Sequence, residues 1–355
     1  MKGEIGISVV IPTRNRAHFL DDCLRSLVVQ RCETSFEVIV VDNASTDATP
    51  EVLAAWSERD GRVRSLREPR LGRAAALNAG MAVARGELLL FTDDDVYVRP
   101  GFVETYRRFF AGHDRGLVFA GGAIHSIALD IEWPWWFSPR TARSLILVDW
   151  GPQRRLNPGE TVWGANTAAP RRVFEELGTW HEEMGVRGDY RPPIDKPELN
   201  EDLEFEERVR AAGGEIWFVA DAVVEHRTEV PGPRIVLRKG FAAGRNDFNR
   251  AERPGMPVDR RRGPRSLRTG LAWVWAMARY LGHALLFRLR PDRDRFDRAW
   301  QAAWSSGWRM EDLVAGGPHD AFDRRVRRVT RVLTQRAASL APQELPEEAP
   351  VRGHR

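Results

Sequence analysis

The feature that most constrains the fold is a short apolar run that ends in consecutive carboxylates. The run is Leu88–Phe91, and the acids Asp93, Asp94 and Asp95 follow it after one threonine. An apolar run of this length, with Gly86 before it and acids after it, is typical of a buried strand. Three adjacent carboxylates repel one another, and a divalent metal with oxygen ligands would offset that repulsion. A solvated acidic turn is the alternative, so this stretch alone leaves both interpretations open.

Strands and helices alternate along the first hundred residues. Buried strands are indicated at Ile5–Ile11, Phe36–Val41, Arg62–Leu66 and Leu88–Phe91. Helical patterns lie between them: one carries Leu20, Leu24 and Leu27 on one stripe, one has Thr49 as its cap, and one spans Leu71–Arg85 with Gly86 as C-cap. This alternation predicts an α/β fold, in which a mostly parallel sheet with right-handed crossovers has helices on its faces.

Polar side chains follow three of these strands at the point where each strand ends. Pro12, Thr13 and Arg14 follow the first, Asp42 ends the second, and Asp93–Asp95 follow the fourth. In such sheets the ligand crevice lies at the carboxyl ends of the strands. Three polar clusters at one edge therefore predict a binding site and favour a metal over a solvated turn.

A general base is expected from a later helix. Asn200 is predicted to cap a helix whose first turn holds Glu201 and Asp202. Asp202 shares the inward face with Phe205 and Val209. Backbone amides at a helix start favour the ionised carboxylate, and an ionised carboxylate facing a cleft suits a general base. The alternative is that both acids only favour the helix dipole.

The composition limits the class of protein and its partners. Hydrophobic residues make up 43% and charged residues 29% of the 355, which is ordinary for a soluble globular chain. The two cysteines, Cys23 and Cys32, match no disulfide framework or metal spacing, so we expect a reduced, cytoplasmic setting. The first residues run directly into a strand, so no signal peptide is expected. No aromatic-plus-basic module is evident, so nucleic acid is not an expected partner.

The C-terminal third has a different character. A dense cationic run, Arg260–Arg262 with Arg265 and Arg268, precedes the apolar stretch Leu271–Phe287. That stretch fits an amphipathic helix on an anionic membrane surface, a helix packed on the catalytic domain, or a bilayer span. We expect a domain over residues 1–230, a helical region over 231–340 and a disordered tail over 341–355.

Two further segments carry weaker signals. Glu132–Phe137 place three tryptophans within four residues, which suits a sugar face, a lipid interface or a cap on the core. Gly185–Pro197 are rich in glycine, proline and charge and are predicted to form a mobile loop beside the site.

Seven ordered segments within residues 5–228 together resemble one known family. They include Val-Val-Ile-Pro-Thr-Arg-Asn-Arg, Phe-Thr-Asp-Asp-Asp-Val and Glu-Asp-Leu-Glu-Phe. In chain order the segments are Val9–Arg16, Val40–Asp47, Leu71–Gly80, Phe91–Val96, Trp163–Ala168, Glu201–Phe205 and Val223–His226. The chain resembles the family 2 inverting glycosyltransferases, nucleotide-sugar-dependent enzymes with the GT-A fold. No single segment would carry the resemblance alone.

The resemblance implies roles for particular residues. The residues that would bind the nucleotide sugar are Pro12, Thr13, Arg14, Asp42, Arg73, Asn78, Asp93 and Asp94. The residues that would lie beside the donor and acceptor sugars are Gly164, Ala165, Asn166 and Glu201. Asp95 and His226 would hold Mg²⁺ or Mn²⁺, and Asp202 would be the catalytic base. Asp94 stands where the family often has a small residue, which leaves the metal contacts among the three acids open.

The implied activity is metal-dependent transfer of a sugar, of the hexosyltransferase type, from a nucleoside-diphosphate sugar to an acceptor hydroxyl. The acceptor would be a glycan, a lipid-linked molecule or a small molecule, and the enzyme would be cytoplasmic or peripheral on the inner face of the cell membrane. One alternative is a nucleotidyltransferase. That class has a glycine-rich phosphate-binding loop after the first strand, where this chain has Pro12–Arg16. The other is a non-catalytic carbohydrate-binding protein, which the retained acids and base disfavour.

Overall fold

The computed structural model describes residues 5–113, 115–127, 147–182, 201–227, 236–237, 240–241, 244, 267–289 and 292–314. The chain divides into two units, of which the first comprises Met1–Leu129, Ile146–Tyr190 and Leu199–Thr228 and the second the rest. The domain boundary expected at residue 230 stays a prediction. The tryptophan-rich segment 132–137, the loop 185–197, Asn200, the arginines at 260–262 and 265, and the tail 341–355 lie outside the described residues.

The first unit is built on one sheet, with the strand order β3-β2-β1-β4-β8-β6-β9-β5 among the described residues and β7 paired with β9. The strands are β1 (Ile7–Thr13), β2 (Phe36–Asp42), β3 (Val63–Arg67), β4 (Leu88–Thr92), β5 (Val96–Val98), β6 (Val118–Ser126), β7 (Arg154–Arg155), β8 (Asn166–Pro170) and β9 (Glu215–His226). The first four strands pair in parallel, whereas β8 lies antiparallel to both β4 and β6.

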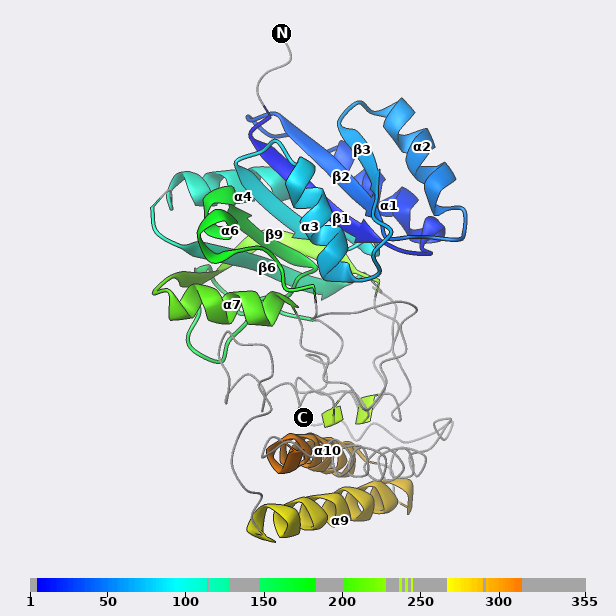
Figure 1. Cartoon of the computed structure of the whole chain (residues 1–355), viewed down its shortest axis with the longest axis vertical. Coiled ribbons are helices and arrows are strands. Elements are labelled where there is room, and N and C mark those ends of the chain that lie inside the picture. Colours follow the sequence, from blue (N-terminus) through cyan, green and yellow to red (C-terminus); the bar gives the residue numbers. More distant parts are fainter. Residues whose placement is uncertain are drawn as a thin grey trace, which may run out of the picture. The chain divides into compact units, whose positions relative to one another are not determined.

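Helices cover both faces of this sheet, as Figure 1 shows. The helices are α1 (Ala17–Val28), α2 (Thr49–Arg59), α3 (Arg73–Val83), α4 (Phe102–Ala111), α6 (Arg171–Leu177) and α7 (Glu201–Ala211). Apolar residues of α1, α2 and α4 share one buried cluster with Val9 and Ile11, whereas those of α3, α6 and α7 share the other with Val10. Successive residues of a strand face opposite sides, so β1 supplies both cores. The predicted α/β fold is confirmed.

Strand direction brings the polar strand ends together. Because β6 is parallel to β9 and antiparallel to β8, and β8 is antiparallel to β4, the strands β1, β2, β4, β6 and β9 all end at one edge. Strand β8 begins at that edge, since Asn166 pairs with Thr92. Thr13, Asp42 and His226 end their strands there, which positions the site.

Residues 215–226 form one strand, β9, whose register with β6 shifts between Gly122 and Ala123. Two local expectations were wrong. Helix α3 ends at Val83 with Ala84 as its C-cap. Gly86 instead allows its own backbone to lie close to the backbone of β1, because a Cβ there would be 2.5 Å from the Ile7 carbonyl carbon. At the start of α2 the Asp47 carboxylate, and not the Thr49 side chain, accepts a hydrogen bond from the first helical amide, at 3.0 Å from the Thr49 nitrogen.

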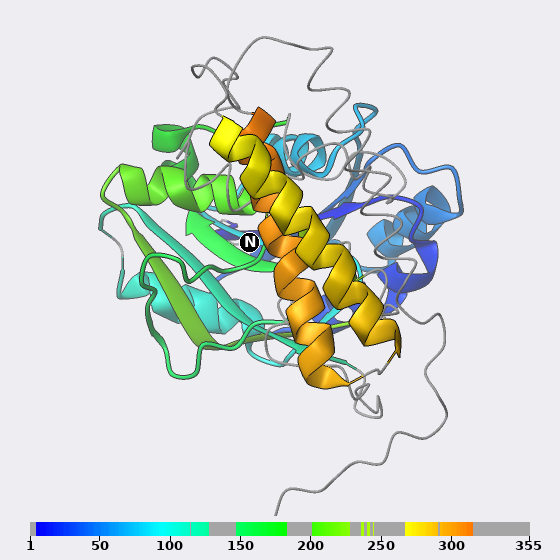
Figure 2. The same ribbon diagram turned by 90° about the horizontal axis from the view of Figure 1, so that it is seen from below.

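In the second unit two long helices pack as an antiparallel pair, α9 (Leu267–Leu289) and α10 (Arg293–Val314). Figures 1 and 2 both show them side by side. Phe287 and Phe296 meet with ring centroids 5.1 Å apart, and Tyr280 is buried with alanines of α10. Among the described residues no helix, α9 included, has the length and apolarity to cross a membrane.

Candidate active site

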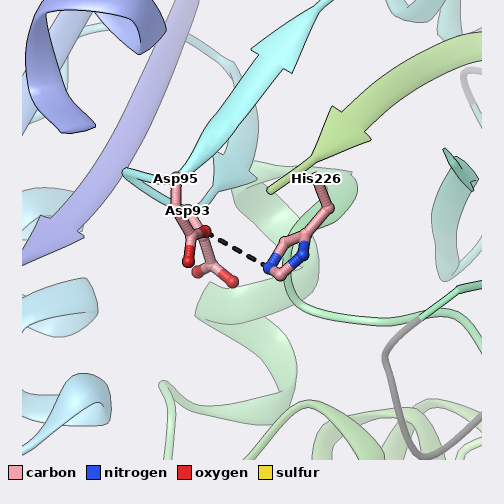
Figure 3. Close-up of side chains that lie close together, drawn as sticks. All are labelled: Asp93, Asp95 and His226. Atoms are coloured by element: carbon pink, nitrogen blue, oxygen red, sulfur yellow. Dashed lines mark ion pairs between the residues drawn. The ribbon is translucent and has the colours of Figure 1, made fainter. Parts of the chain in front are cut away.

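The three consecutive acids after β4 point to different partners. Asp93 and Asp95 converge with His226 from the end of β9, as Figure 3 shows, and one ligand atom from each lies within 4.8 Å of the others. Asp95 Oδ1 is 3.3 Å from His226 Nε2. Asp94 is buried and accepts a hydrogen bond from the Thr13 hydroxyl at 2.6 Å. The outer acids therefore form one group with the histidine, and the middle acid does not belong to it.

This group has the chemistry of a divalent-metal site. Two carboxylates and an imidazole suit Mn²⁺ or Mg²⁺, which favour oxygen ligands. Burial alone would lower the pKa of His226, but the hydrogen bond and charge of Asp95 raise it above its ordinary value. Burial alone would raise the pKa of Asp95, and His226 and Arg16 together lower it. The side chains present thus fit the ion that the sequence led us to expect.

Asp94 reduces the repulsion between the three acids. Burial raises its pKa to about 7, although the charge of Arg16 and the Thr13 hydroxyl oppose that shift. A carboxyl with this pKa is partly protonated near neutral pH. The middle acid therefore carries less than a full negative charge between Asp93 and Asp95.

Arg73, the first residue of α3, ties three segments of the site together. Its Nη2 donates to Asp93 Oδ1 at 2.7 Å, and its Nη1 donates to Glu201 at the start of α7. The side chain is 19% exposed. Gly164 lies against this guanidinium, since a Cβ there would be 2.9 Å from Arg73 Nη1. One cation thus fixes the acids after β4 against the helix that carries Asp202.

Asp202 is buried beside this bridge. Its Oδ2 accepts a hydrogen bond from the Gly164 backbone amide at 2.8 Å. Burial and the charge of Glu201 raise the pKa of Asp202 to about 6, against the opposing effects of Arg73 and the Gly164 amide. The expectation that backbone amides keep this group strongly ionised was therefore incomplete, because burial outweighs them.

The residues around Gly164 hold the backbone of the site in place. The Ala165 carbonyl accepts the Thr92 hydroxyl at 2.7 Å. Asn166 is completely buried, and its amide donates to the carbonyls of Ala123 at 2.9 Å and Ala222 at 2.8 Å. Its Oδ1 accepts the Tyr106 hydroxyl at 2.6 Å. Asn166, expected beside the sugars, thus has its amide bonded within the chain and joins β6, β8 and β9.

The expected nucleotide-binding residues fall into two groups. Thr13 follows Pro12 at the end of β1 and is paired in the sheet register with Asp42 at the end of β2. The Arg14 guanidinium donates to the carbonyls of residues 43 and 44, at 2.9 and 2.6 Å, and so supports the loop after Asp42. Asn78 instead bonds the Trp180 carbonyl at 2.9 Å, so the structure does not bring it into the acid cluster.

Two arginines that sequence reasoning did not assign also lie at this edge. Arg67 ends β3 with its Nη1 3.4 Å from Asp42 Oδ2. Arg16, between β1 and α1, donates to Asp95 Oδ2 at 2.6 Å. Arg67 could have been found from its place at the end of a strand, and Arg16 from its place in the segment Val9–Arg16.

Comparison with known proteins points to one family. Residues 8–178 match the family described as Glycosyl transferase family 2. Glycosyltransferase GlyG of Streptococcus pneumoniae serotype 4 is 38% identical over 100 residues, which are 28% of this chain and 33% of that protein. Validoxylamine A glucosyltransferase of Streptomyces hygroscopicus subsp. jinggangensis is 29% identical over 231 residues, 58% of this chain and 52% of that protein. The chain thus spans about half or less of the length of these curated relatives.

A solved structure supports the fold. The mannosyltransferase PcManGT from Pyrobaculum calidifontis, in complex with GDP-Man and Mn²⁺, superposes with a TM-score of 0.51 at 18% identity. The superposition covers 96% of this chain and 87% of that chain. At this identity the likeness concerns the fold alone.

The bridge through Arg73 predicts a stability effect. Arg73→Met leaves the carboxylates of Asp93 and Glu201 without their shared cation, and breaking a buried ion pair costs about 3 kcal/mol of unfolding free energy. Arg70→Met is the matched control, since the Arg70 guanidinium is exposed and its ion pairs are worth little. Urea unfolding of both variants measures the difference. Equal, small losses would contradict the bridge.

Proposed function

We propose that this chain, whose residues 8–178 match glycosyl transferase family 2, transfers a sugar from a nucleoside-diphosphate sugar to an acceptor hydroxyl with inversion. One observation carries the proposal: the acids Asp93 and Asp95 with His226 stand at the same sheet edge as the buried Asp202. A separate carboxylate is thus available for the proton while the others face the donor.

The proposed reaction is a single displacement at the anomeric carbon. Asp202 accepts the proton of the acceptor hydroxyl while the acceptor oxygen bonds to that carbon. The bond from the carbon to the phosphate oxygen breaks on the opposite face, and the nucleoside diphosphate leaves with the electron pair. Because no covalent intermediate forms, the configuration inverts.

The donor and the metal belong to the same proposal. Mg²⁺ or Mn²⁺, held by Asp95 and His226 with Asp93, would neutralise charge on the leaving diphosphate. The presence of GDP-Man and Mn²⁺ in a mannosyltransferase of the same fold supports a nucleotide sugar and a divalent ion here. Thr13 and Asp42, at the ends of β1 and β2, would bind the nucleoside. The acceptor would be a glycan, a lipid-linked molecule or a small molecule.

The acidity of Asp202 suits this role. A general base works best when its pKa lies near the working pH, because a stronger base is protonated and a weaker base takes the proton less readily. Burial brings the pKa of Asp202 to about 6. At neutral pH the group is then mostly ionised and more basic than an exposed aspartate.

Asp202→Asn therefore lowers kcat by at least about 100-fold while Mn²⁺ binding persists. The control is Glu204→Gln, a buried acid on the same helix whose carboxylate pairs with Arg208. Because the base must be deprotonated, kcat of the unaltered enzyme rises with pH through about 6 and then levels off. Sugar release from nucleotide sugars, followed against pH, measures both effects. Full activity in Asp202→Asn would contradict the role of Asp202 as the catalytic base.

The second unit supports a further part of the proposal, contact with an anionic membrane surface. Helix α9 buries one side against α10 and exposes large apolar side chains on the other. These exposed residues are Leu271, Val274, Trp275, Leu285, Leu286 and Leu289. Arg279 lies over the Trp275 ring at 4.5 Å, so cationic and aromatic groups stand beside the apolar stripe. Such a face suits the interface of a membrane with anionic lipids, and the enzyme would then act as a peripheral protein on its cytoplasmic side.

Sedimentation with phosphatidylglycerol vesicles tests the membrane contact. The full chain is expected to sediment at low salt and to be released as salt rises. Leu286→Glu should weaken binding about tenfold, because one leucine side chain no longer enters the apolar layer. Gln301→Glu introduces the same charge on an exposed position of α10 and should bind as the original chain does. Equal binding by both variants, or none at low salt, would exclude this surface.

A further inference from the structure

Arg16 is placed where the chain leaves β1 and enters α1. Its Nη1 lies 2.6 Å from Asp95 Oδ2 and 3.7 Å from Asp94 Oδ1. Its backbone amide bonds the Thr49 hydroxyl at 3.2 Å, so the main chain is held while the side chain is 39% exposed. The guanidinium carbon also lies 5.3 Å from the centroid of the Phe19 ring. The backbone of Arg16 is therefore held in place, while its side chain is partly exposed to solvent.

Asp95 presents its two oxygens to two different side chains. Oδ2 accepts from Arg16, and Oδ1 faces His226 at 3.3 Å. A divalent ion held by Asp95, His226 and Asp93 would lie at the same carboxylate that Arg16 contacts. Two like charges at one carboxylate repel each other at this range. Arg16 and the ion therefore compete for Asp95.

The neighbouring arginines have less freedom to move. Arg73 is fixed between the carboxylates of Asp93 and Glu201 and is 19% exposed. Arg14 donates to two backbone carbonyls of the loop at residues 43 and 44. Arg16 has a more exposed side chain than Arg73 and bonds Asp95 through one nitrogen, with the Phe19 ring beside it as a second contact.

We propose that Arg16 is a movable cation, which turns from Asp95 to the diphosphate of the donor when the divalent ion binds. This inference rests on the proposed function and adds a residue to it. A guanidinium presents a planar fork of N–H donors that matches phosphate oxygens. A donor diphosphate bound to that ion would place phosphate oxygens near Asp95, where the released guanidinium could bind them. Arg16 thereby opposes ion binding alone and favours binding of ion and donor together.

This role has a signature that a purely structural residue lacks, because removing the charge changes two affinities in opposite directions. In Arg16→Gln, Mn²⁺ alone should bind about tenfold more tightly, since the competing cation is gone. A nucleoside diphosphate in saturating Mn²⁺ should bind about tenfold more weakly, since a phosphate contact is lost. A residue that only supports the fold would weaken both.

The experiment is titration calorimetry on the full chain, with Mn²⁺ alone and then with UDP and GDP in saturating Mn²⁺. Arg25→Gln is the control, because Arg25 lies on α1 and its exposed side chain pairs with Asp21. Arg16→Lys keeps the charge and should keep the weak Mn²⁺ affinity while losing part of the nucleotide affinity. This variant also supplies the test if Arg16→Gln does not fold.

The outcomes separate this inference from the proposed function. An original chain that binds neither Mn²⁺ nor nucleotide would contradict the proposed function, and the inference with it. An original chain that binds both, with Mn²⁺ no tighter in Arg16→Gln than in Arg25→Gln, would overturn the role of Arg16 alone. Tighter Mn²⁺ and weaker nucleotide in Arg16→Gln would support it.

Discussion

The mutual repulsion of three adjacent carboxylates at the end of β4 is the constraint around which this site is arranged. Each of the three acids is stabilised by a different set of neighbouring groups. Asp93 is paired with Arg73, Asp94 is buried against the Thr13 hydroxyl, and Asp95 stands between Arg16 and His226. Thr13 and Arg16 lie at and just after the end of β1, Arg73 begins α3 and His226 ends β9, so meeting the constraint brings distant parts of the sequence to one sheet edge. In the proposed function, His226 would help to bind the divalent ion, and Arg16 would bind the diphosphate of the donor.

Strand β8, which runs opposite to β1, β4 and β6, adds its own first residues to that edge. Strand β8 runs antiparallel between β4 and β6, so its first residues, and not its last, lie beside the acids. Gly164 is thereby set against Arg73, and its amide bonds Asp202. Asn166 locks this strand to its neighbours from inside the sheet. A buried amide with all of these bonds is expensive to disturb, because any partner left behind is buried and unsatisfied.

Much of this fold could be predicted from the sequence, since apolar runs and the residues that end them are local signals. The alternation of strands and helices and the convergence of Thr13, Asp42 and Asp93–Asp95 on one edge follow from such signals. The interior role of Asn166 could not, because Tyr106, its partner, lies 60 residues away. Likewise, the ion pair of Arg16 with Asp95 spans 79 residues. For α9, the apolar stretch Leu271–Phe287 fitted several environments, and the packing of α10 on one of its faces is a long-range feature that the sequence pattern does not reveal.

The account depends most on a divalent ion and a nucleoside diphosphate meeting at the end of β4. Crystals of the full chain grown with Mn²⁺ and a nucleoside diphosphate test this directly, because manganese is located by its anomalous scattering. We expect one anomalous peak in contact with Asp95 and His226, with Asp93 beside it and a diphosphate oxygen on the ion. A diphosphate bound with no peak at these side chains, or a peak at other residues, would contradict the account.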